Sequence, residues 1–241
     1  MDLKNRVAVI TGGSKGYGKG IARVLKGNGC RVWILSSNEG DLKKAAEEIG
    51  VNCCVCDITI PQDWDAAFDK IVGKEKTIDL LVNNAGAGIA IKNLVEQTDD
   101  EIYRSIMINL TGHIYGIRRA AKLMIAQKNG IIINISSVCA DHAWPGWSIY
   151  SAAKAGIEML ARSLHNEFRT SNVKITTLTP SWGSTNFLKS AKLKDWTKDI
   201  TEKVMQPDQM GELIVKICTL DDHLYIPKIR VQPMVQEINP M

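Results

Sequence analysis

Short apolar runs alternate with amphipathic stretches along most of the chain. The runs are rich in Val and Ile, as in strands buried on both faces of a sheet. They are Arg6–Thr11, Arg31–Leu35, Val51–Val55, Ile78–Asn83, Gly130–Ser136, Val173–Thr179 and Ile226–Val231. The stretches between them have the apolar spacing or the composition of helices. The clearest are Gly18–Lys26, Asp41–Ile49, Ile114–Gln127 and Ser148–Arg169.

Strand and helix patterns that alternate this often predict an α/β fold. Consecutive strands joined through helices run parallel, and right-handed crossovers place the helices on both faces of the sheet. We therefore expect a doubly wound parallel sheet of about seven strands. No repeat, low-complexity tract or linker divides the sequence, so residues 1–241 are expected to form a single domain.

The composition is that of an ordinary globular protein and gives no sign of a nucleic-acid or membrane partner. Apolar residues make up 45% of the chain and charged residues 23%, which are ordinary globular values. The formal net charge of +4 is small and dispersed, so we expect no nucleic-acid partner. The run Val7–Ile10 is too short for a signal peptide, and no segment reaches the roughly 20 apolar residues of a membrane span. We expect a soluble, cytoplasmic protein with no membrane partner.

Six cysteines raise the question of a metal site or disulfides. Cys53, Cys54 and Cys56 fall in one apolar run, where alternate side chains point to opposite faces of a strand and cannot converge on one ion. No second pair of cysteines or histidines has the spacing of a zinc site. We expect buried, unligated thiols and no metal.

A glycine-rich turn links the first strand to the first helix. Its sequence is Thr11-Gly12-Gly13-Ser14-Lys15-Gly16-Tyr17-Gly18. Glycines allow a ligand to approach the backbone, and the N–H groups at a helix start suit a pyrophosphate. Two other patterns fit this turn less well. Its G-x-S-x-G matches the nucleophile elbow of hydrolases, but that elbow normally follows several strands. Residues 13–19 match the G-x-x-x-x-G-K part of a P-loop, but Gly20 stands where a P-loop has the hydroxyl that binds magnesium.

The spacing Thr11-Gly12-x-x-x-Gly16-x-Gly18 resembles the cofactor loop of the short-chain dehydrogenases/reductases. Further motifs follow in that family's order: Asn83-Asn84-Ala85-Gly86, then Asn109, then Ser137, then Tyr150-Ser151-Ala152-Ala153-Lys154. The likeness extends from the first strand to at least Pro180. It implies a Rossmann fold, an NAD(P) cofactor and an oxidoreductase acting on CH–OH or C=O groups. It also implies a homodimer or homotetramer, in which the helices at residues 114–127 and 148–169 pair between subunits.

Four residues are the expected catalytic set: Asn109, Ser137, Tyr150 and Lys154. Tyr150 and Lys154 lie one helical turn apart, and an ammonium beside a phenol lowers the pKa of the phenol from about 10. Tyr150 is then able to exchange a proton with the substrate oxygen, to which Ser137 donates a hydrogen bond. The resemblance further implies that Asn109 supports Lys154 through ordered water and that Lys154 binds the nicotinamide ribose.

The same resemblance assigns the cofactor contacts. The expected residues are Gly12, Ser14, Lys15, Gly16, Tyr17, Gly18, Ser36, Ser37, Asp57, Ile58, Asn84, Ala85, Gly86, Tyr150, Lys154, Pro180 and Thr185. For Asp57, which resembles the family's adenine-contacting residue, a role as a helix cap before Pro61 is equally compatible with the sequence.

The end of the second strand favours NADP(H) over NAD(H). NAD enzymes usually carry Asp or Glu there to hold the ribose 2′-hydroxyl. Ser36 and Ser37 occupy that place and would not repel a 2′-phosphate, and Lys15 adds positive charge. The usual Arg is missing and Glu39 is near, so an NAD-dependent secondary-alcohol dehydrogenase remains the alternative.

The segment after the sixth strand is expected to close over the substrate. Ser181 and Gly183 depart from the family pattern in this loop, whereas Thr185 occupies the place that usually meets the nicotinamide carboxamide. Residues 182–206 are expected to form a lid, in which Leu193, Trp196, Ile200 and Val204 share one helical face. The chain end lacks the glycine-rich strand of typical oxoacyl reductases. It looks more like the branch that acts on small hydroxy acids, amino alcohols and assorted ketones.

Tryptophan is unusually frequent for so few aromatic residues, with six Trp and three Phe. Trp144, Trp147 and Trp182 all fall near the expected site, which predicts an indole-lined pocket for a cyclic or apolar carbonyl compound. The main hypothesis is therefore an NADP-dependent reductase of a ketone or aldehyde. A non-catalytic nucleotide-binding regulator is the alternative from another class, and a serine hydrolase acting through Ser14 is a third.

Overall fold

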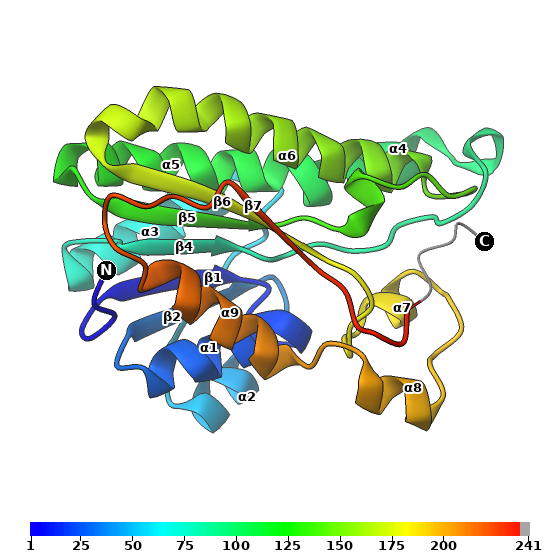
Figure 1. Cartoon of the computed structure of the whole chain (residues 1–241), viewed down its shortest axis with the longest axis horizontal. Coiled ribbons are helices and arrows are strands. Elements are labelled where there is room, and N and C mark those ends of the chain that lie inside the picture. The colour runs from blue at the N-terminus through cyan, green and yellow to red at the C-terminus, as the bar shows by residue number, and fades with distance from the viewer. Residues whose placement is uncertain (237–241) are drawn as a thin grey trace.

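The computed structural model describes residues 1–236 as one α/β layered domain (Figure 1). Its seven strands all run parallel, in the order β3-β2-β1-β4-β5-β6-β7. The strands are β1 Val7–Thr11, β2 Arg31–Ser36, β3 Asn52–Val55, β4 Leu80–Asn83, β5 Gly130–Ile135, β6 Val173–Pro180 and β7 Lys228–Val231. The order reverses direction between β1 and β4. In open α/β sheets, ligands bind at such a switch point, outside the carboxyl ends of the strands.

Helices cover both faces of the sheet, as Figure 1 shows. The helices are α1 Gly16–Gly27, α2 Glu39–Ile49, α3 Pro61–Glu75, α4 Asp99–Ile106, α5 Gly112–Gln127, α6 Ser148–Phe168, α7 Phe187–Ser190, α8 Lys198–Lys203 and α9 Pro207–Cys218. Side chains from α1, α2 and α9 form one core with the sheet. Side chains from α3, α5 and α6 form a second core on the other face. Burial on both faces explains why the strand sequences are continuous apolar runs.

The expected Rossmann architecture is confirmed, and each of the seven expected strands is present. Side chains next to the helix starts cap α2 and α4. The side chain of Asn38 caps α2 by accepting from Asp41 N at 2.9 Å. Thr98 and Glu101 form a reciprocal capping box at the start of α4.

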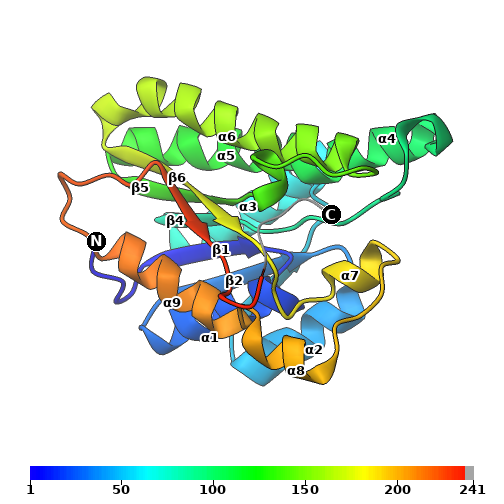
Figure 2. The ribbon, with the colours of Figure 1, turned by 45° about the vertical axis from the view of Figure 1, so that its right-hand side comes forward.

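The segment after β6 differs from the expected single helical face. It contains the short helices α7 and α8, with an irregular stretch between them, and Figure 2 shows both beside the carboxyl ends of the strands. Lys192 in that stretch has a φ of 55°, which breaks the helix, and Ala191 is buried. The prediction of one face from Leu193 to Val204 was therefore wrong, because tertiary contacts outweigh the local pattern.

The cysteines also differ in part from expectation. Cys30, Cys56, Cys139 and Cys218 are buried free thiols, whereas Cys53 and Cys54 on the edge strand β3 are only half-buried. Within residues 1–236, no helix combines the length and the apolar character required to cross a membrane.

Candidate active site

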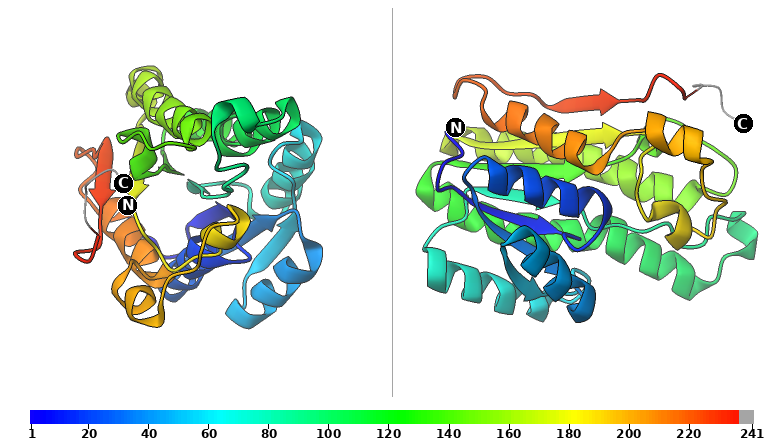
Figure 3. Two further views of the ribbon diagram at one scale, coloured as in Figure 1. Left: turned by 90° about the vertical axis from the view of Figure 1, so that its right-hand side faces the viewer. Right: turned by 90° about the horizontal axis from the view of Figure 1, so that it is seen from below.

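The motif residues gather at the carboxyl ends of the central strands. The glycine turn follows β1, Asn84 follows β4, Ser137 follows β5, and Pro180 ends β6. The end-on view in the left panel of Figure 3 faces this edge of the sheet, with the segment that contains α7 and α8 in the lower part of the view. Parallel strands thus bring together residues that are more than 100 positions apart in sequence.

The glycine turn is held to β4 by a set of short hydrogen bonds. Thr11 Oγ1 accepts from the backbone N–H groups of Asn84 at 2.9 Å and Ala85 at 3.0 Å. Asn84 Nδ2 donates back to the Thr11 carbonyl at 2.9 Å. Gly12 and Gly16 both have positive φ, as expected for a turn that presents its backbone to a ligand. The two motifs therefore form one rigid support at the start of α1.

Tyr150 and Lys154 are buried together on α6. The Lys154 Nζ atom lies 5.7 Å from the centre of the Tyr150 ring, and the two side chains are 3% and 7% exposed. Lys154 Nζ donates to the Ile135 carbonyl at 2.9 Å, which fixes the ammonium at the end of β5. The 21-residue helix thus places both groups at one point beside the central strands.

The pKa values of this pair differ from the sequence expectation. Burial raises the pKa of the Tyr150 phenol; the adjacent Cys139 thiol adds to the shift, and the Ser137 hydroxyl opposes it. Burial also lowers the pKa of Lys154 to about 8. The prediction that the ammonium lowers the Tyr150 pKa is therefore wrong, since desolvation of the phenol dominates.

Asn109 lies in a π-helical turn, Met107–Thr111, between α4 and α5. Such turns are frequent at functional sites. Its Nδ2 donates to the carbonyls of Ala87 at 2.8 Å and Ser105 at 3.0 Å, and its Oδ1 accepts from Ala87 N at 3.1 Å. A Cβ on Gly86 would lie 2.9 Å from Asn109 Oδ1 and 3.4 Å from Lys154 Nζ. Only glycine at this position lets the chain pass between the two side chains.

Ser137 begins a short 3-10 turn, Val138–Ala140, directly after β5. Its Oγ accepts from Cys139 N at 3.2 Å, which holds the hydroxyl at the strand end. The turn that Ser137 begins packs on α6, which carries Tyr150, and the Ser137 hydroxyl opposes the effect of burial on the Tyr150 pKa. The four residues expected from the sequence are thus brought to one place, with Gly86 between Asn109 and Lys154.

Two interactions define the end of β2, where a nucleotide 2′ position is expected. Ser14 Oγ donates to Ser36 Oγ at 3.2 Å. Lys15 forms an ion pair with Asp41 of α2, with side chains 53% and 38% exposed. Ser37 is exposed. Sequence reasoning missed Asp41, which directly faces the cation expected to favour NADP.

Asp57 follows β3 but does not cap the next helix. Its Oδ1 accepts from Thr59 N at 2.9 Å and Thr59 Oγ1 at 2.7 Å, whereas the N-cap of α3 is Ile60. The capping alternative for Asp57 is therefore wrong. Ile58 is buried beside Gly112 of α5.

The segment after β6 rests on the glycine turn. Thr185 packs on Gly16, and Thr185 Oγ1 accepts from Phe187 N at 3.2 Å. The Tyr17 ring reaches Gly183, and the Tyr17 hydroxyl is a buried atom without a hydrogen-bond partner among the described residues. A positive-φ backbone cradle, a buried Lys154 and an unpartnered hydroxyl fit a dinucleotide with polar ribose and phosphate groups.

The expected tryptophans divide into two groups. Trp147 packs against Tyr150 with ring centres 5.7 Å apart, and Trp144 packs against Trp147 at 6.5 Å. Trp182 instead pairs with Trp196, which lies in the same segment after β6, at 4.5 Å. Phe187 of α7 also contacts Tyr150, at 5.3 Å. Sequence reasoning missed Phe187, because no spacing rule links it to the catalytic motif.

Comparison with known proteins identifies the family. A sequence model described as short chain dehydrogenase matches residues 6–196. The chain belongs to this family. It is therefore an NAD(P)-dependent oxidoreductase.

Members of the short chain dehydrogenase family resemble this chain over most of its length. A 3-oxoacyl-[acyl-carrier-protein] reductase of Chlamydia muridarum is 33% identical over 208 residues, covering 82% of this chain and 83% of the relative. A metagenomic short-chain oxidoreductase solved in complex with NADP is 27% identical, with a TM-score of 0.84 and coverage of 98% and 100%. A 3-ketoacyl-(acyl-carrier-protein) reductase of Brucella melitensis, complexed with NADH, shares the fold at 24% identity and a TM-score of 0.87, over 95% and 98% of the two chains.

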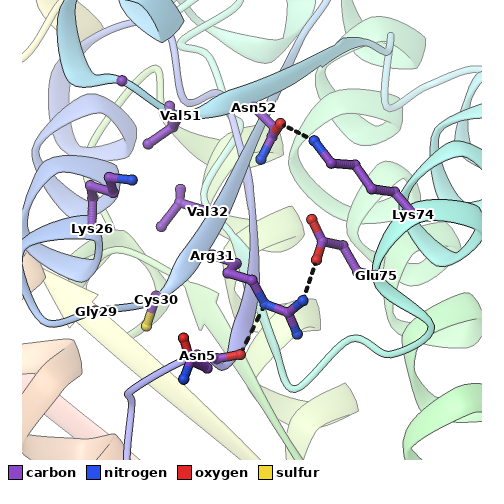
Figure 4. A pocket seen from close by; sticks show the side chains of 11 residues that line it. Asn5, Lys26, Gly29, Cys30, Arg31, Val32, Val51, Asn52, Lys74 and Glu75 are labelled. Atoms are coloured by element: carbon purple, nitrogen blue, oxygen red, sulfur yellow. Dashed lines mark hydrogen bonds and ion pairs between the residues drawn. The ribbon is translucent and has the colours of Figure 1, made fainter.

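A pocket of about 540 Å³ opens at the amino ends of β2 and β3, at the opposite end of the sheet from the family motifs, and Figure 4 shows the residues that line it. Arg31 pairs with Glu75 at 2.7 Å, and Lys74 donates to Asn52 Oδ1 at 2.8 Å. Because these polar groups are already paired and the pocket lies at the amino ends of the strands, we assign the chemistry to the carboxyl ends.

An ionic cluster ties the last strand of this dehydrogenase to its motif residues. Lys228 of β7 contacts Asp141 and Glu158, each at 2.7 Å. Glu158 lies one turn after Lys154 on α6, and its Oε1 accepts from Thr179 Oγ1 at 2.9 Å. The cluster therefore connects β6, β7, α6 and the loop that follows Ser137.

Proposed function

We propose that this dehydrogenase uses NADP(H) to reduce a ketone or aldehyde to an alcohol, in a reversible reaction with Tyr150 as the general acid and base. The observation that carries the proposal is the burial of Tyr150 and Lys154 together, beside the Ser137 hydroxyl, at the carboxyl ends of the central strands. This arrangement matches what proton transfer to a carbonyl oxygen requires.

In reduction, the Tyr150 hydroxyl gives its proton to the carbonyl oxygen while Ser137 donates a hydrogen bond to the same atom. The nicotinamide, when bound, supplies the hydride that the carbonyl carbon receives. In oxidation, Tyr150 takes the proton from the alcohol. Lys154 holds the ribose hydroxyls and, as a cation, stabilises the phenolate that forms on Tyr150. Asn109 holds the segment after Gly86 against the site through its two bonds to Ala87.

A bound dinucleotide would be held by the glycine turn and the end of β2. Gly12 to Gly18 would hold the pyrophosphate, and Asn84, Ala85 and Gly86 the ribose. Pro180 and Thr185 would contact the nicotinamide, and Asp57 and Ile58 the adenine. Ser36 and Ser37 offer hydroxyls and no carboxylate to a 2′-phosphate, and Lys15 offers a cation. A structural neighbour complexed with NADP gives further support.

A specific contact also favours the alternative nucleotide. Asp41 pairs with Lys15 and neutralises the cation on which the NADP preference depends. An NAD-dependent secondary-alcohol dehydrogenase is therefore the second candidate. A structural neighbour that shares this fold is complexed with NADH.

Thermal unfolding with each nucleotide, followed by a carbonyl screen, tests the proposal. We expect NADPH to raise the melting temperature more than NADH, and a ketone or aldehyde to consume NADPH absorbance. Larger protection by NADH points to the second candidate. Protection by NADPH with no carbonyl compound consumed by the intact enzyme would contradict carbonyl reduction as its activity.

Apolar side chains on the outer surfaces of α4, α5 and α6 support pairing of two copies. Tyr103 is 63% exposed and Met159 56% exposed, and Ile114 adds a third apolar side chain. Exposed apolar residues gathered on neighbouring helices are typical of subunit contacts. Light scattering after size-exclusion chromatography distinguishes a homodimer or homotetramer from a monomer.

A further inference from the structure

Three aromatic rings close on one another at the candidate catalytic tyrosine. Trp147 lies 5.7 Å from Tyr150, Phe187 lies 5.3 Å from Tyr150, and Trp147 and Phe187 lie 6.0 Å apart. The last pair is nearly parallel, with an interplanar angle of 14°. These separations fall within the range of attractive aromatic contacts. One flat ring therefore already stacks on Trp147 beside the group that would transfer the proton.

The three rings are held by elements of very different length. Trp147 and Tyr150 lie at the start of α6, a 21-residue helix that packs on β6. Phe187 begins α7, a four-residue helix in the lid segment, and its side chain is only half-buried. Its ring also reaches Gly88, where a Cβ would lie 3.0 Å from Phe187 Cζ. Of the three rings, Phe187 is thus the one that the segment after β6 carries.

The chemistry of the site fixes where a substrate substituent must go. The reacting carbonyl oxygen has to lie within hydrogen-bond distance of the Tyr150 and Ser137 hydroxyls. The group attached to the carbonyl carbon is then next to the Tyr150 ring, where the Phe187 ring lies. A flat, apolar group in that position keeps the stacking on Trp147 that Phe187 otherwise provides.

We infer that the substrate is an aryl ketone, or the corresponding benzylic alcohol, whose ring replaces Phe187 on the face of Trp147. Phe187 is an internal plug of this aryl subsite, and the lid carries it away as the substrate enters. The inference rests on the proposed carbonyl reduction and adds the substrate class. The balance of the reaction is unchanged: the carbonyl carbon gains a hydride, and its oxygen gains the Tyr150 proton.

Two ketones of similar size, acetophenone and cyclohexyl methyl ketone, provide the test, because one carries a flat ring and the other a puckered ring. We expect kcat/KM with NADPH to favour acetophenone by roughly tenfold in the intact enzyme. Trp147→Leu should abolish that preference mainly through KM, whereas Trp147→Phe should retain most of it. Trp196→Phe, in the lid but not among the three rings, is the matched control and should leave the ratio unchanged.

Phe187→Ala tests whether the Phe187 ring is displaced by the substrate or stays in place as part of the subsite. Without the plug, the KM for acetophenone should fall, because the incoming ring no longer displaces a side chain. A rise in that KM overturns the plug. Binding of 1-phenylethanol to the enzyme loaded with NADPH, which cannot oxidise the alcohol, gives a readout without turnover when followed by tryptophan fluorescence, and quenching should be lost in Trp147→Leu.

The outcomes separate the aryl subsite from the proposed function. Equal effects of Trp147→Leu on both ketones, or equal kcat/KM for both in the intact enzyme, overturn the aryl subsite while carbonyl reduction stands. Reduction of other ketones but not of acetophenone does the same. If no carbonyl compound consumes NADPH, the proposed function itself fails.

Discussion

The Tyr17 ring fills the space beside Gly183 that any larger residue would need. A Cβ on residue 183 would overlap the Tyr17 hydroxyl and the ring carbon that bears it. Burial raises the pKa of that phenol, so it remains protonated. The departure from the family pattern at residue 183 is thereby explained, because this contact joins the glycine turn to the lid segment.

Gly183→Ala should therefore displace the lid from the glycine turn. Overpacking of a close contact lowers the free energy of unfolding by about 1–3 kcal/mol, which urea unfolding measures. The double variant with Tyr17→Ala should recover most of the loss, because the smaller side chain at residue 17 leaves room for the methyl group. Gly73→Ala is the control: it lies within α3 with no atom near its Cβ position, and should stabilise the protein by about 0.5–1 kcal/mol. Equal losses in the single and double variants would show that the contact is not responsible.

Asp41→Asn should tighten NADPH binding by about twofold to fivefold without changing NADH binding. The substitution releases Lys15 from an exposed ion pair, and such pairs contribute little individually. The freed ammonium then faces the 2′-phosphate alone. Fluorescence titration with both nucleotides measures the two dissociation constants, and Glu47→Gln, an exposed residue near the other end of α2, is the charge-matched control. Equal tightening for NADH would remove the assigned role of Lys15.

NADPH binding should weaken as the pH rises through about 8. The Lys154 pKa is lowered to about 8 from 10.5 by burial, so the free enzyme loses this cation in that range, whereas binding of the nucleotide favours the charged form. Linkage then gives roughly a tenfold increase in Kd between about pH 7 and about pH 9. Lys154→Arg keeps its charge and should show a flatter profile. Calorimetry in two buffers measures the proton taken up, and no uptake near pH 9 would contradict the assignment.

The contribution of Lys154 to the free energy of unfolding should become more favourable as the pH rises from about 8 toward 10.5. Because the folded pKa of Lys154 lies below the unfolded value, the cost of burying its charge is fully present below about pH 8. That cost decreases as the pH rises toward 10.5, since the folded chain then binds fewer protons than the unfolded chain. The stability difference between the wild type and Lys154→Met should therefore shift in favour of the wild type over this window.

Much of the fold could be predicted because burial on both faces of the sheet appears directly in the sequence. The β5 run Gly130–Ile135 is buried at every position and was recognisable as a strand. The lid was not, because Ala191 packs against Gly88, far away in sequence, and Lys192 adopts a left-handed conformation. Local helix preference carries no information on such contacts.

The candidate site shows the same division. The positions of Ser137, Tyr150 and Lys154 follow from motif spacing on a strand end and one helix. Their pKa values depend on burial, which the spacing does not reveal, and this is why the Tyr150 expectation was wrong. The contacts of Asp41 and Phe187 could not be predicted from the sequence. They depend on the fold, which places α2 beside the glycine turn and α7 beside α6.

Lys228→Met should lower the free energy of unfolding by about 1–3 kcal/mol. It leaves Glu158, whose side chain is 10% exposed, without its cation, and an unpaired buried carboxylate is costly. The exposed pair Lys203–Asp199 on α8 provides the control, because Lys203→Met should change stability little. Urea unfolding compares the two, and Glu158→Gln combined with Lys228→Met should regain part of the loss. Equal stability of Lys228→Met and Lys203→Met would show that the cluster is not a stabilising contact.

The most direct measurement of the central claim is the single-turnover rate of ketone reduction by Tyr150→Phe with NADPH already bound. The substitution removes one hydroxyl, the proton donor, and keeps the ring that packs against Trp147 and Phe187. We predict a rate lower by roughly a thousandfold, with the Kd for NADPH unchanged within about twofold. A rate within about tenfold of the wild type would contradict the assignment of Tyr150 as the proton donor.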